Sequence, residues 1–314
     1  YKDNIVYGQQ RGGSYYISTN IDRVAYNHTS KTTDEEKTST KKALLNKDFR
    51  QALAFGADRK AAVSQVFGDE VGPRKLRTSF TPPTFVQVGD QTFGQVTKTE
   101  LDKLDNVWKD VSLDDAQDSL HNVDKAKTKL EAAKKTLQAD GVQFPIHLDL
   151  PVSSTQTDFV RQAQSYKQSI EEALGVENVV VDIQQVSDDE LGSMTVLATS
   201  KDNIDWDINP NSGWSPDYAD PSTYLDAFDP TSGPTLLGAL GIAPGSDSSA
   251  IKAVGLDKYK ELLDDANSEK TDLEKRYSKY AKAQAWLTDS ALIIPVNSDG
   301  AQMLVTKKVP GTGA

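Results

Sequence analysis

Apolar residues recur every three or four positions in several segments, which predicts a series of amphipathic helices. The clearest lies at 122–139, where four apolar residues share one face and lysines fill the other. Gly141 stands where a helix-ending glycine is expected. Further helices are expected at 46–58, 61–67, 159–174, 188–198 and 271–287. The last of them begins with Thr-Asp-Leu-Glu, a capping-box pattern.

Short apolar runs between these helices predict strands. The run at 144–150 alternates apolar and polar residues, and 179–183 is β-branched and continuous, as in a buried strand. With a third strand near 205–208, helices and strands alternate from residue 122 to residue 208. This alternation favours an α/β layer with a largely parallel sheet. Strands are also expected at 15–19, 292–296 and 302–305.

Two polar stretches lack such a pattern. Residues 27–45 mix charges of both signs with threonines, and we expect a solvated loop there. Residues 71–119 contain Gly-Pro, Pro-Pro and isolated aromatic residues, and we expect a long irregular segment.

The composition argues against several classes of protein. The 314 residues include 35 Lys and Arg against 46 Asp and Glu, a net charge of −11, which argues against binding to nucleic acid or to anionic lipid. No cysteine is present, so disulfides, thiol nucleophiles and cysteine-ligated zinc are excluded. This absence fits an exported bacterial protein. The apolar runs fall far short of the ~20 residues that a membrane span needs.

The sequence shows no recognisable catalytic constellation. The three histidines stand apart from one another, and His147 is expected to be a hydrogen-bonded structural residue of a strand. No nucleophile elbow, Walker loop or dinucleotide-binding motif follows a predicted strand. The pairs Asp205/Asp207 and Asp217/Asp220 invite a calcium interpretation, but the twelve-residue calcium loop is absent. We expect no catalytic residue, no metal ligand and no cofactor.

The segment 211–225 follows a predicted strand, and ligands of α/β proteins bind at the ends of strands. It combines the rings of Trp214 and Tyr218 with the carboxylates of Asp217 and Asp220. Such a loop suits a ligand that carries a cation on an apolar body. A structural interpretation is equally open: Asp220 starts a helix, Asp217 caps a turn and Trp214 fills the core.

The run Gly-Trp-Ser-Pro-Asp-Tyr-Ala-Asp-Pro at 213–221 resembles the Gly-Trp-x-x-Asp-Tyr-x-x-Pro motif of oligopeptide- and dipeptide-binding proteins of ABC importers. Three further stretches, at 48–59, 122–126 and 289–296, resemble segments of the same family in the same order. The sequence at 216–225 is most similar to that of streptococcal and related Gram-positive lipoproteins. The resemblance covers residues 15–305.

The resemblance implies an α/β lobe of a type II periplasmic-binding-protein-like clamshell, with a mixed, mostly parallel sheet flanked by helices. Residues 1–314 would form the C-terminal lobe as a single unit, with loop insertions near 27–45 and 85–119. Both ends of the chain are then expected to be cut from a longer protein. In such a protein the peptide is clamped between two lobes.

The function implied is extracellular oligopeptide binding for uptake by an ABC permease, in a monomeric, lipid-anchored protein of a Gram-positive cell surface. Asp217 would accept the peptide's α-ammonium group, while backbone groups of 211–215 pair with the peptide backbone. Residues 191–194 lack a pocket aromatic residue that some relatives carry. A non-peptide cargo, or an adhesion or signalling role, stays open. The expected binding residues are Asp217, Trp214, Tyr218, Asn211, Ser212, Gly213 and Ser215.

Overall fold

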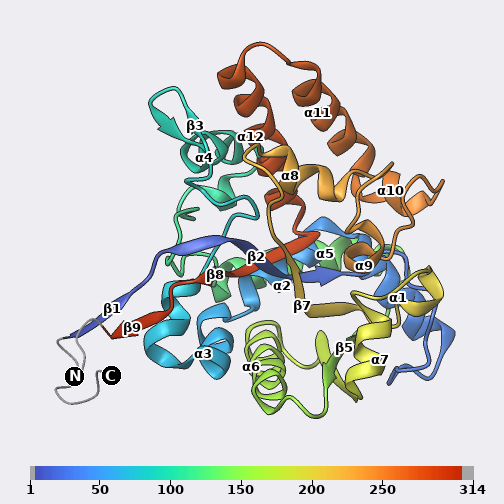
Figure 1. The fold of residues 1–314 in the computed structure, drawn as a ribbon. Helices are drawn as coiled ribbons and strands as arrows, with labels where there is room; N and C mark the ends of the chain where they lie inside the picture. The colour runs from blue at the N-terminus through green and yellow to red at the C-terminus, as the bar shows by residue number, and fades with distance from the viewer. Residues whose placement is uncertain (1–3, 306–314) are drawn as a thin grey trace.

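The structure is a computed structural model, and it describes residues 4–305. Its centre is a three-stranded antiparallel sheet (Figure 1). β2 (Gln10–Thr19) lies in the middle, between β7 (Ile208–Trp214) and β8 (Ile293–Gly300). β7 is therefore an edge strand of this sheet, with β2 as its neighbour.

Neighbouring side chains of β2 point into two hydrophobic cores, because successive residues of a strand face opposite ways. The Tyr16 ring meets Phe80 and Phe228 edge-on, at centroid distances of 5.4 and 5.9 Å. Ile17 belongs to the other core, together with apolar residues of α2 (Lys47–Gly56) and α5 (Val123–Ala139). The sheet is thus covered by helices on both faces along much of its length.

A second, parallel pair of strands lies beside the central sheet. β5 (Ile146–Ser153) and β6 (Val179–Val186) pair along their whole length and are joined by α6 (Thr157–Leu174). The expected helix–strand alternation is confirmed, but the largely parallel sheet is not. Local patterns show where strands occur, whereas the antiparallel pairing of β7 with the distant β2 is a long-range property.

The polar stretch 27–45 is not a solvated loop. Its second half is the helix α1 (Asp34–Leu45), which begins with a capping box between Thr33 and Glu36 and buries Ala43 and Leu44. The sequence pattern did not predict this helix, because its buried face contains serine and threonine as well as apolar residues. The first half of the stretch lies in a buried ionic network described below.

The stretch 85–119 is also ordered. It contains a small hairpin, the helix α4 (Phe93–Leu104), which packs on α12 (Leu273–Ser290), and a short 3-10 turn. Trp108 in that turn is buried, and its indole N–H donates to Asp289 Oδ1 at 2.7 Å. Segment 71–119 therefore contributes to the core rather than draping loosely over it.

The remaining elements are helices, 3-10 turns and two short strands. They are α3 (Arg59–Lys75), β3 (Gln87–Val88), β4 (Gln91–Thr92), η2 (Asn106–Trp108), α7 (Asp188–Met194), η3 (Lys201–Asn203), α8 (Ser222–Leu225), η4 (Asp226–Phe228), α9 (Leu236–Leu240), α10 (Ser249–Val254) and α11 (Leu256–Ser268). None of the helices in residues 4–305 is long and apolar enough to cross a membrane.

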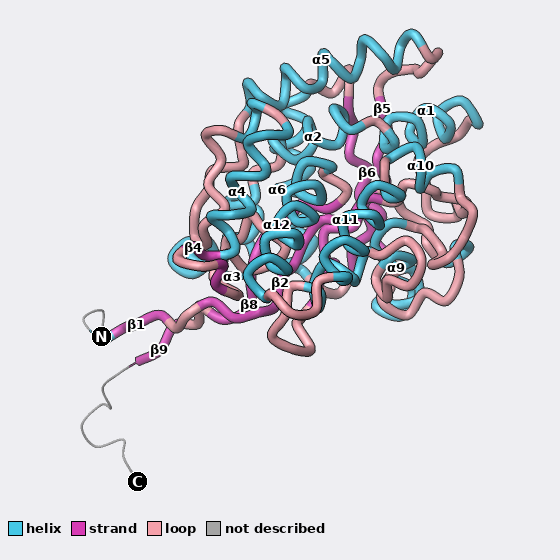
Figure 2. The backbone as a smooth tube through the Cα atoms, turned by 90° about the horizontal axis from the view of Figure 1, so that it is seen from above, coloured by secondary structure: helices cyan, strands magenta, loops and turns pink. Residues whose placement is uncertain are grey.

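Near its two ends the chain forms a narrow antiparallel ribbon. β1 (Ile5–Tyr7) pairs with β9 (Met303–Val305), and the ribbon extends away from the body of the molecule (Figures 1 and 2). The Tyr7 ring lies 4.0 Å from the Arg74 guanidinium of α3. The strands β1 and β9 thus extend side by side from the body of the molecule.

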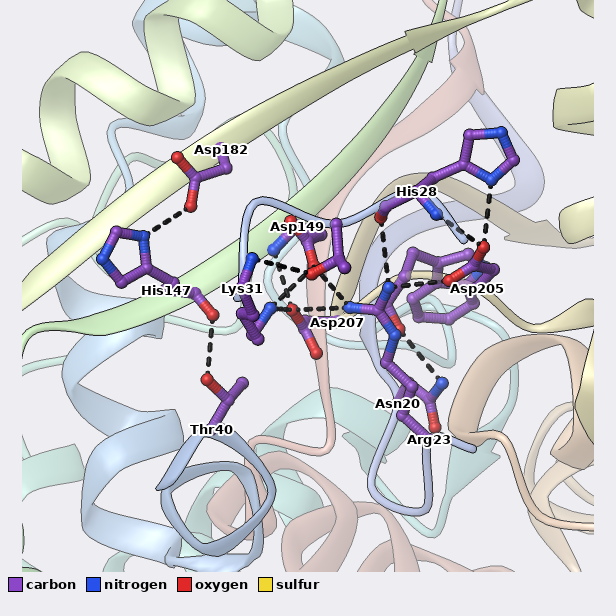
Figure 3. A network of polar contacts seen from close by, with 12 residues as sticks. Asn20, Arg23, His28, Lys31, Thr40, His147, Asp149, Asp182, Asp205 and Asp207 are labelled. Atoms are coloured by element: carbon purple, nitrogen blue, oxygen red, sulfur yellow. Dashed lines mark hydrogen bonds and ion pairs between the residues drawn. The ribbon is translucent and has the colours of Figure 1, made fainter. Parts of the chain in front are cut away.

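Five buried charged side chains tie β2, β5 and β7 together (Figure 3). Arg23 binds Asp149 at 2.6 Å, Asp205 at 2.7 Å and Asp207 at 2.9 Å. Lys31 binds Asp149 at 2.6 Å and Asp207 at 2.5 Å. Because Asp205 and Asp207 precede β7, these ion pairs fix where that strand begins.

The two cations of this network and hydrogen bonds from the backbone balance its three carboxylates. Burial is the largest single influence on the pKa of Asp149 and would raise it, but the Lys31 ammonium, the Thr29 hydroxyl and the Arg23 guanidinium together outweigh burial and hold that pKa far below its usual range. The excess carboxylate, Asp205, accepts the backbone N–H groups of Asn27 and His28, each at 2.9 Å. Asp205 and Asp207 thus bind cations of the protein itself, which argues against the calcium interpretation.

The expected structural role of His147 is confirmed. Its Nδ1 lies 2.7 Å from Asp182 Oδ2, across the parallel pair of β5 and β6 (Figure 3).

We predict that Asp149→Asn destabilises the protein by about 3–5 kcal/mol, because it leaves buried cations without a full partner. Urea unfolding at pH 7 measures the change. The matched control is Asp34→Asn, since the Asp34 side chain is 93% exposed and pairs only with Lys37 on the surface of α1. That control should change the free energy of unfolding by less than about 0.5 kcal/mol.

The effect of Asp149→Asn should depend on pH in a defined direction. The folded-state pKa of Asp149 lies below its unfolded value of about 3.9, so its charge stabilises the fold above that value. The advantage of the native chain over the variant should therefore be complete at pH 6–7 and shrink as the pH falls below about 4. A difference that stays constant down to pH 3 would mean that packing, not charge, causes the loss.

Candidate functional site

A groove of about 670 Å³ runs along the edge strand β7. One wall is β7 itself with Tyr16 of β2, and the facing walls come from α7 with the turn after it and from α9. Its lining residues are Tyr16, Gln156, Asp188, Leu191, Gly192, Thr195, Val196, Ala198, Asn209, Asn211, Ser212, Gly213, Trp214, Pro234, Thr235, Leu237, Gly238, Ala239 and Pro244. The groove is mostly apolar, with a row of polar groups along the strand.

The backbone of β7 supplies that row. Residues 212–214 pair with β2 on one side only, so alternate N–H and C=O groups point away from the sheet and toward the groove. The N–H of Asn211 already donates to Asn209 Oδ1 at 3.1 Å. An unpaired strand edge beside a groove can accept another extended chain as an additional strand.

Gly213 matters for the shape of this edge. A Cβ at this position would lie 2.7 Å from Cδ1 of Tyr15, closer than real contacts allow. The absence of a side chain therefore lets the half-exposed Tyr15 ring lie across β7. Sequence patterns did not indicate Tyr15, because its contact with Gly213 depends on strand register.

Trp214 has features of both the ligand-binding and the structural interpretation of this segment. Its indole N–H donates to the carbonyl of Thr223 at 2.6 Å, and its ring packs against the core that contains Tyr224. The same residue lines the groove. Trp214 thus joins the candidate site to the turn that follows β7.

The two carboxylates of the motif have different surroundings. Asp220 accepts the N–H and hydroxyl of Ser222 at 3.0 and 2.6 Å and pairs with Arg276 at 2.9 Å. Burial opposes ionisation of Asp220, but the hydrogen bonds from Arg276 and Ser222 together outweigh it and lower the pKa. Asp220 is the residue that shapes the turn, and it too is neutralised by a cation of the protein.

The Asp217 carboxylate is exposed and forms no hydrogen bond or ion pair with residues 4–305. Only its backbone N–H is engaged, donating to Thr223 Oγ1 at 2.9 Å. The expected turn-capping role of its side chain is therefore absent, and the carboxylate is free to meet a ligand. It does not line the groove, and neither do Ser215 and the half-exposed Tyr218.

The structure thus brings four of the seven expected binding residues into one groove, namely Asn211, Ser212, Gly213 and Trp214. The helix α9, which also lines the groove, was not expected to contribute. Leu191 and Gly192 line the groove at the place where the sequence lacks the pocket aromatic residue of some relatives.

Comparison with protein families agrees with this architecture. Residues 1–235 match the model of bacterial extracellular solute-binding proteins, family 5, middle region. The chain belongs to this family. The resemblance inferred from the motif at 213–221 is thereby confirmed.

Several curated members of the family are similar to nearly the whole chain. The oligopeptide-binding protein AliA of Streptococcus pneumoniae is 53% identical over 99% of this chain and 47% of its own length. The oligopeptide-binding protein SarA of Streptococcus gordonii has the same identity and coverage, and AmiA of S. pneumoniae is 50% identical over 100% of this chain and 48% of its own length. The chain spans about half the length of these relatives.

Solved structures show the same fold. A Listeria monocytogenes OppA bound to peptide matches 96% of this chain and 45% of its own with a TM-score of 0.60 at 19% identity. A substrate-binding domain of an oligopeptide ABC transporter from Bacillus anthracis matches 97% of this chain and 47% of its own, with a TM-score of 0.61 at 22% identity. The mixed α/β fold of this chain is thus shared with about half of each of these two proteins.

The two motif carboxylates should respond differently to amidation. Asp220→Asn should destabilise the protein by about 1–2 kcal/mol, because it weakens charged hydrogen bonds to Arg276 and Ser222. Asp217→Asn should stay within about 0.5 kcal/mol, since the side chain is exposed and unpartnered. Urea unfolding of both variants checks this contrast. Equal losses would make Asp217 a structural residue.

Proposed function

We propose that this chain binds oligopeptides in an extended conformation outside the cell, as the part of an ABC-importer binding protein that carries the β7 groove. The observation that supports this proposal best is the unpaired edge of β7 along a groove of about 670 Å³. The 50–53% identical relatives that are named oligopeptide-binding proteins support the same ligand class.

Pairing with β7 would give affinity with little sequence preference. The backbone groups of 212–214 offer hydrogen bonds that any extended peptide can complete. Side chains on one face of the peptide would enter the groove between α7 and α9, while those on the other face point away. Such a division suits a protein that captures many different peptides.

Asp217 is proposed as the anchor of the peptide's α-ammonium group. Its carboxylate is exposed and unpaired among the described residues, whereas Asp205, Asp207 and Asp220 are neutralised by cations of the protein. Asp217 lies three residues after Trp214, the last residue of β7. A peptide that pairs with the end of β7 can therefore present its amino terminus near this carboxylate, with Tyr218 and Ser215 beside it.

The whole binding protein is proposed to act as a monomeric, lipid-anchored clamshell at a Gram-positive cell surface that delivers peptide to a permease. The family consists of binding proteins, and we propose no catalytic activity for the chain. The groove is one wall of the site, and a second lobe would close over the peptide from the other side.

We predict that Asp217→Asn, in the protein as its gene encodes it, raises the Kd of free-amine peptides tenfold or more. The loss corresponds to a charge-assisted hydrogen bond of about 1.5–3 kcal/mol. Calorimetry with a free and an N-acetylated version of the same peptide measures the effect, and the acetylated version should be much less affected.

The matched control is Asp34→Asn, which removes another exposed carboxylate from α1, outside the groove. It should leave both constants unchanged. If Asp217→Asn weakens the free and acetylated peptides equally, Asp217 does not anchor the amino terminus.

We also predict that the 314-residue chain alone binds peptides only in the millimolar range. Without a second wall, half of the contacts are absent while most of the entropy cost of immobilising the peptide remains. Calorimetry of the isolated chain against a mixed peptide pool tests this. A micromolar constant would mean that the groove suffices and that no closing lobe is needed.

A further inference from the structure

One charged residue lines the groove. Asp188, the first residue of α7, lies at the groove beside Gln156, and no other charged residue of 4–305 lines it. All other lining residues are apolar or neutral. A single carboxylate therefore sets the charge that a ligand meets in this groove.

The protein orients this carboxylate without neutralising it. It accepts hydrogen bonds from the hydroxyl groups of Ser153 and Thr155, the latter at 2.8 Å, and from Gln156 Nε2 at 3.3 Å. No Lys, Arg or His within residues 4–305 forms an ion pair with it. The hydroxyls of Ser153 and Thr155 lower the pKa of Asp188, so the group is ionised at neutral pH. Its negative charge is left for a ligand to balance.

The wall next to Asp188 is apolar. Val196 in the turn after α7 is 85% exposed although it lines the groove. Leu191 of α7 and Leu237 of α9 also line the groove, and both pack against the small core that contains Met194 and Trp206. An exposed apolar surface rimmed by polar groups is typical of a binding site for an apolar group.

We propose that the groove selects ligands by charge: it takes an apolar side chain between α7 and α9 and a cationic group at Asp188, and it rejects acidic side chains there. This inference rests on the proposed peptide-binding function. The cation is the ammonium or guanidinium of a Lys or Arg side chain, since the peptide's own amino terminus is proposed to lie at Asp217. Asp188 is thus a specificity-determining residue, distinct from Asp217 on the exposed turn.

The test uses a set of matched peptides with the protein as its gene encodes it. One position at a time is Lys, Met or Glu in an otherwise apolar peptide, and each peptide is made with a free and an acetylated amino terminus. Calorimetry at low salt gives the ratio of Kd for Glu to Kd for Lys at each position. At the position that reaches Asp188, the Glu peptide should bind about threefold to tenfold more weakly than the Lys peptide, the range of a solvent-accessible ion pair.

Asp188→Asn should bring that ratio close to one, and it keeps the size of the side chain. The matched control is Asp189→Asn, the same change at the next residue of α7, which is exposed but does not line the groove. It should leave the ratio as in the native protein. If the effect of Asp188→Asn follows the Lys position, the inference is supported. If acetylation abolishes the effect on all peptides, the cation at Asp188 is the amino terminus, and both this inference and the anchoring role of Asp217 are overturned.

A second variant tests the apolar wall separately. Val196→Ser should raise the Kd of peptides that carry Leu in the groove about threefold, without changing the Glu-to-Lys ratio, because it removes buried apolar surface and no charge. Thermal unfolding of the Val196→Ser protein should match the native protein, since Val196 is exposed. Asp188→Asn should lower the unfolding temperature by a few degrees at most, because it weakens the hydrogen bonds from Ser153 and Thr155 but leaves an exposed side chain.

The outcomes separate this inference from the proposed function. If no peptide of the set binds the native protein, the proposed function is wrong and this inference with it. If peptides bind but show the same Glu-to-Lys ratio in the native and Asp188→Asn proteins, peptide binding stands and the charge selection is overturned.

Discussion

The antiparallel pairing of β2 with β7 is the constraint on which the candidate site depends. β2 runs through the middle of the molecule between two cores, and β7 lies along it as an edge strand. The start of β7 is fixed by the buried ion pairs of Asp205 and Asp207 with Arg23 and Lys31. Its end is fixed by Trp214, whose indole group binds the carbonyl of Thr223. Between these two attachments the outer edge of the strand is left open.

An open strand edge is usually a hazard, because it can pair with other chains and cause aggregation. In this fold residues of α7 and α9 line the groove along the edge. In the proposed function, a peptide backbone supplies the missing strand. The apolar wall and the one unbalanced carboxylate of the groove are then proposed to discriminate between peptides.

Helices with a continuous apolar face, such as α5 and α6, could be predicted from the sequence because their pattern is local. The motif at 213–221 likewise marked residues of the site. Strand direction could not be predicted, since the partner of β7 lies near the start of the chain. The helix α1 was missed because serine and threonine occupy part of its buried face. No local sequence pattern marks Asp188 or Val196 as residues of the candidate site. They line the groove because α7 packs against β5, a contact that the sequence pattern does not predict.

The most direct test of the account is hydrogen–deuterium exchange of the backbone amides in β7, with and without a bound peptide. If an extended peptide adds to the strand edge, the exchange of outward-facing amides among residues 212–214 should slow markedly when peptide is present. Amides of α11, on the far side of the core, should exchange at an unchanged rate. Binding of peptide that leaves the exchange of 212–214 unaltered would contradict strand addition and move the site away from β7.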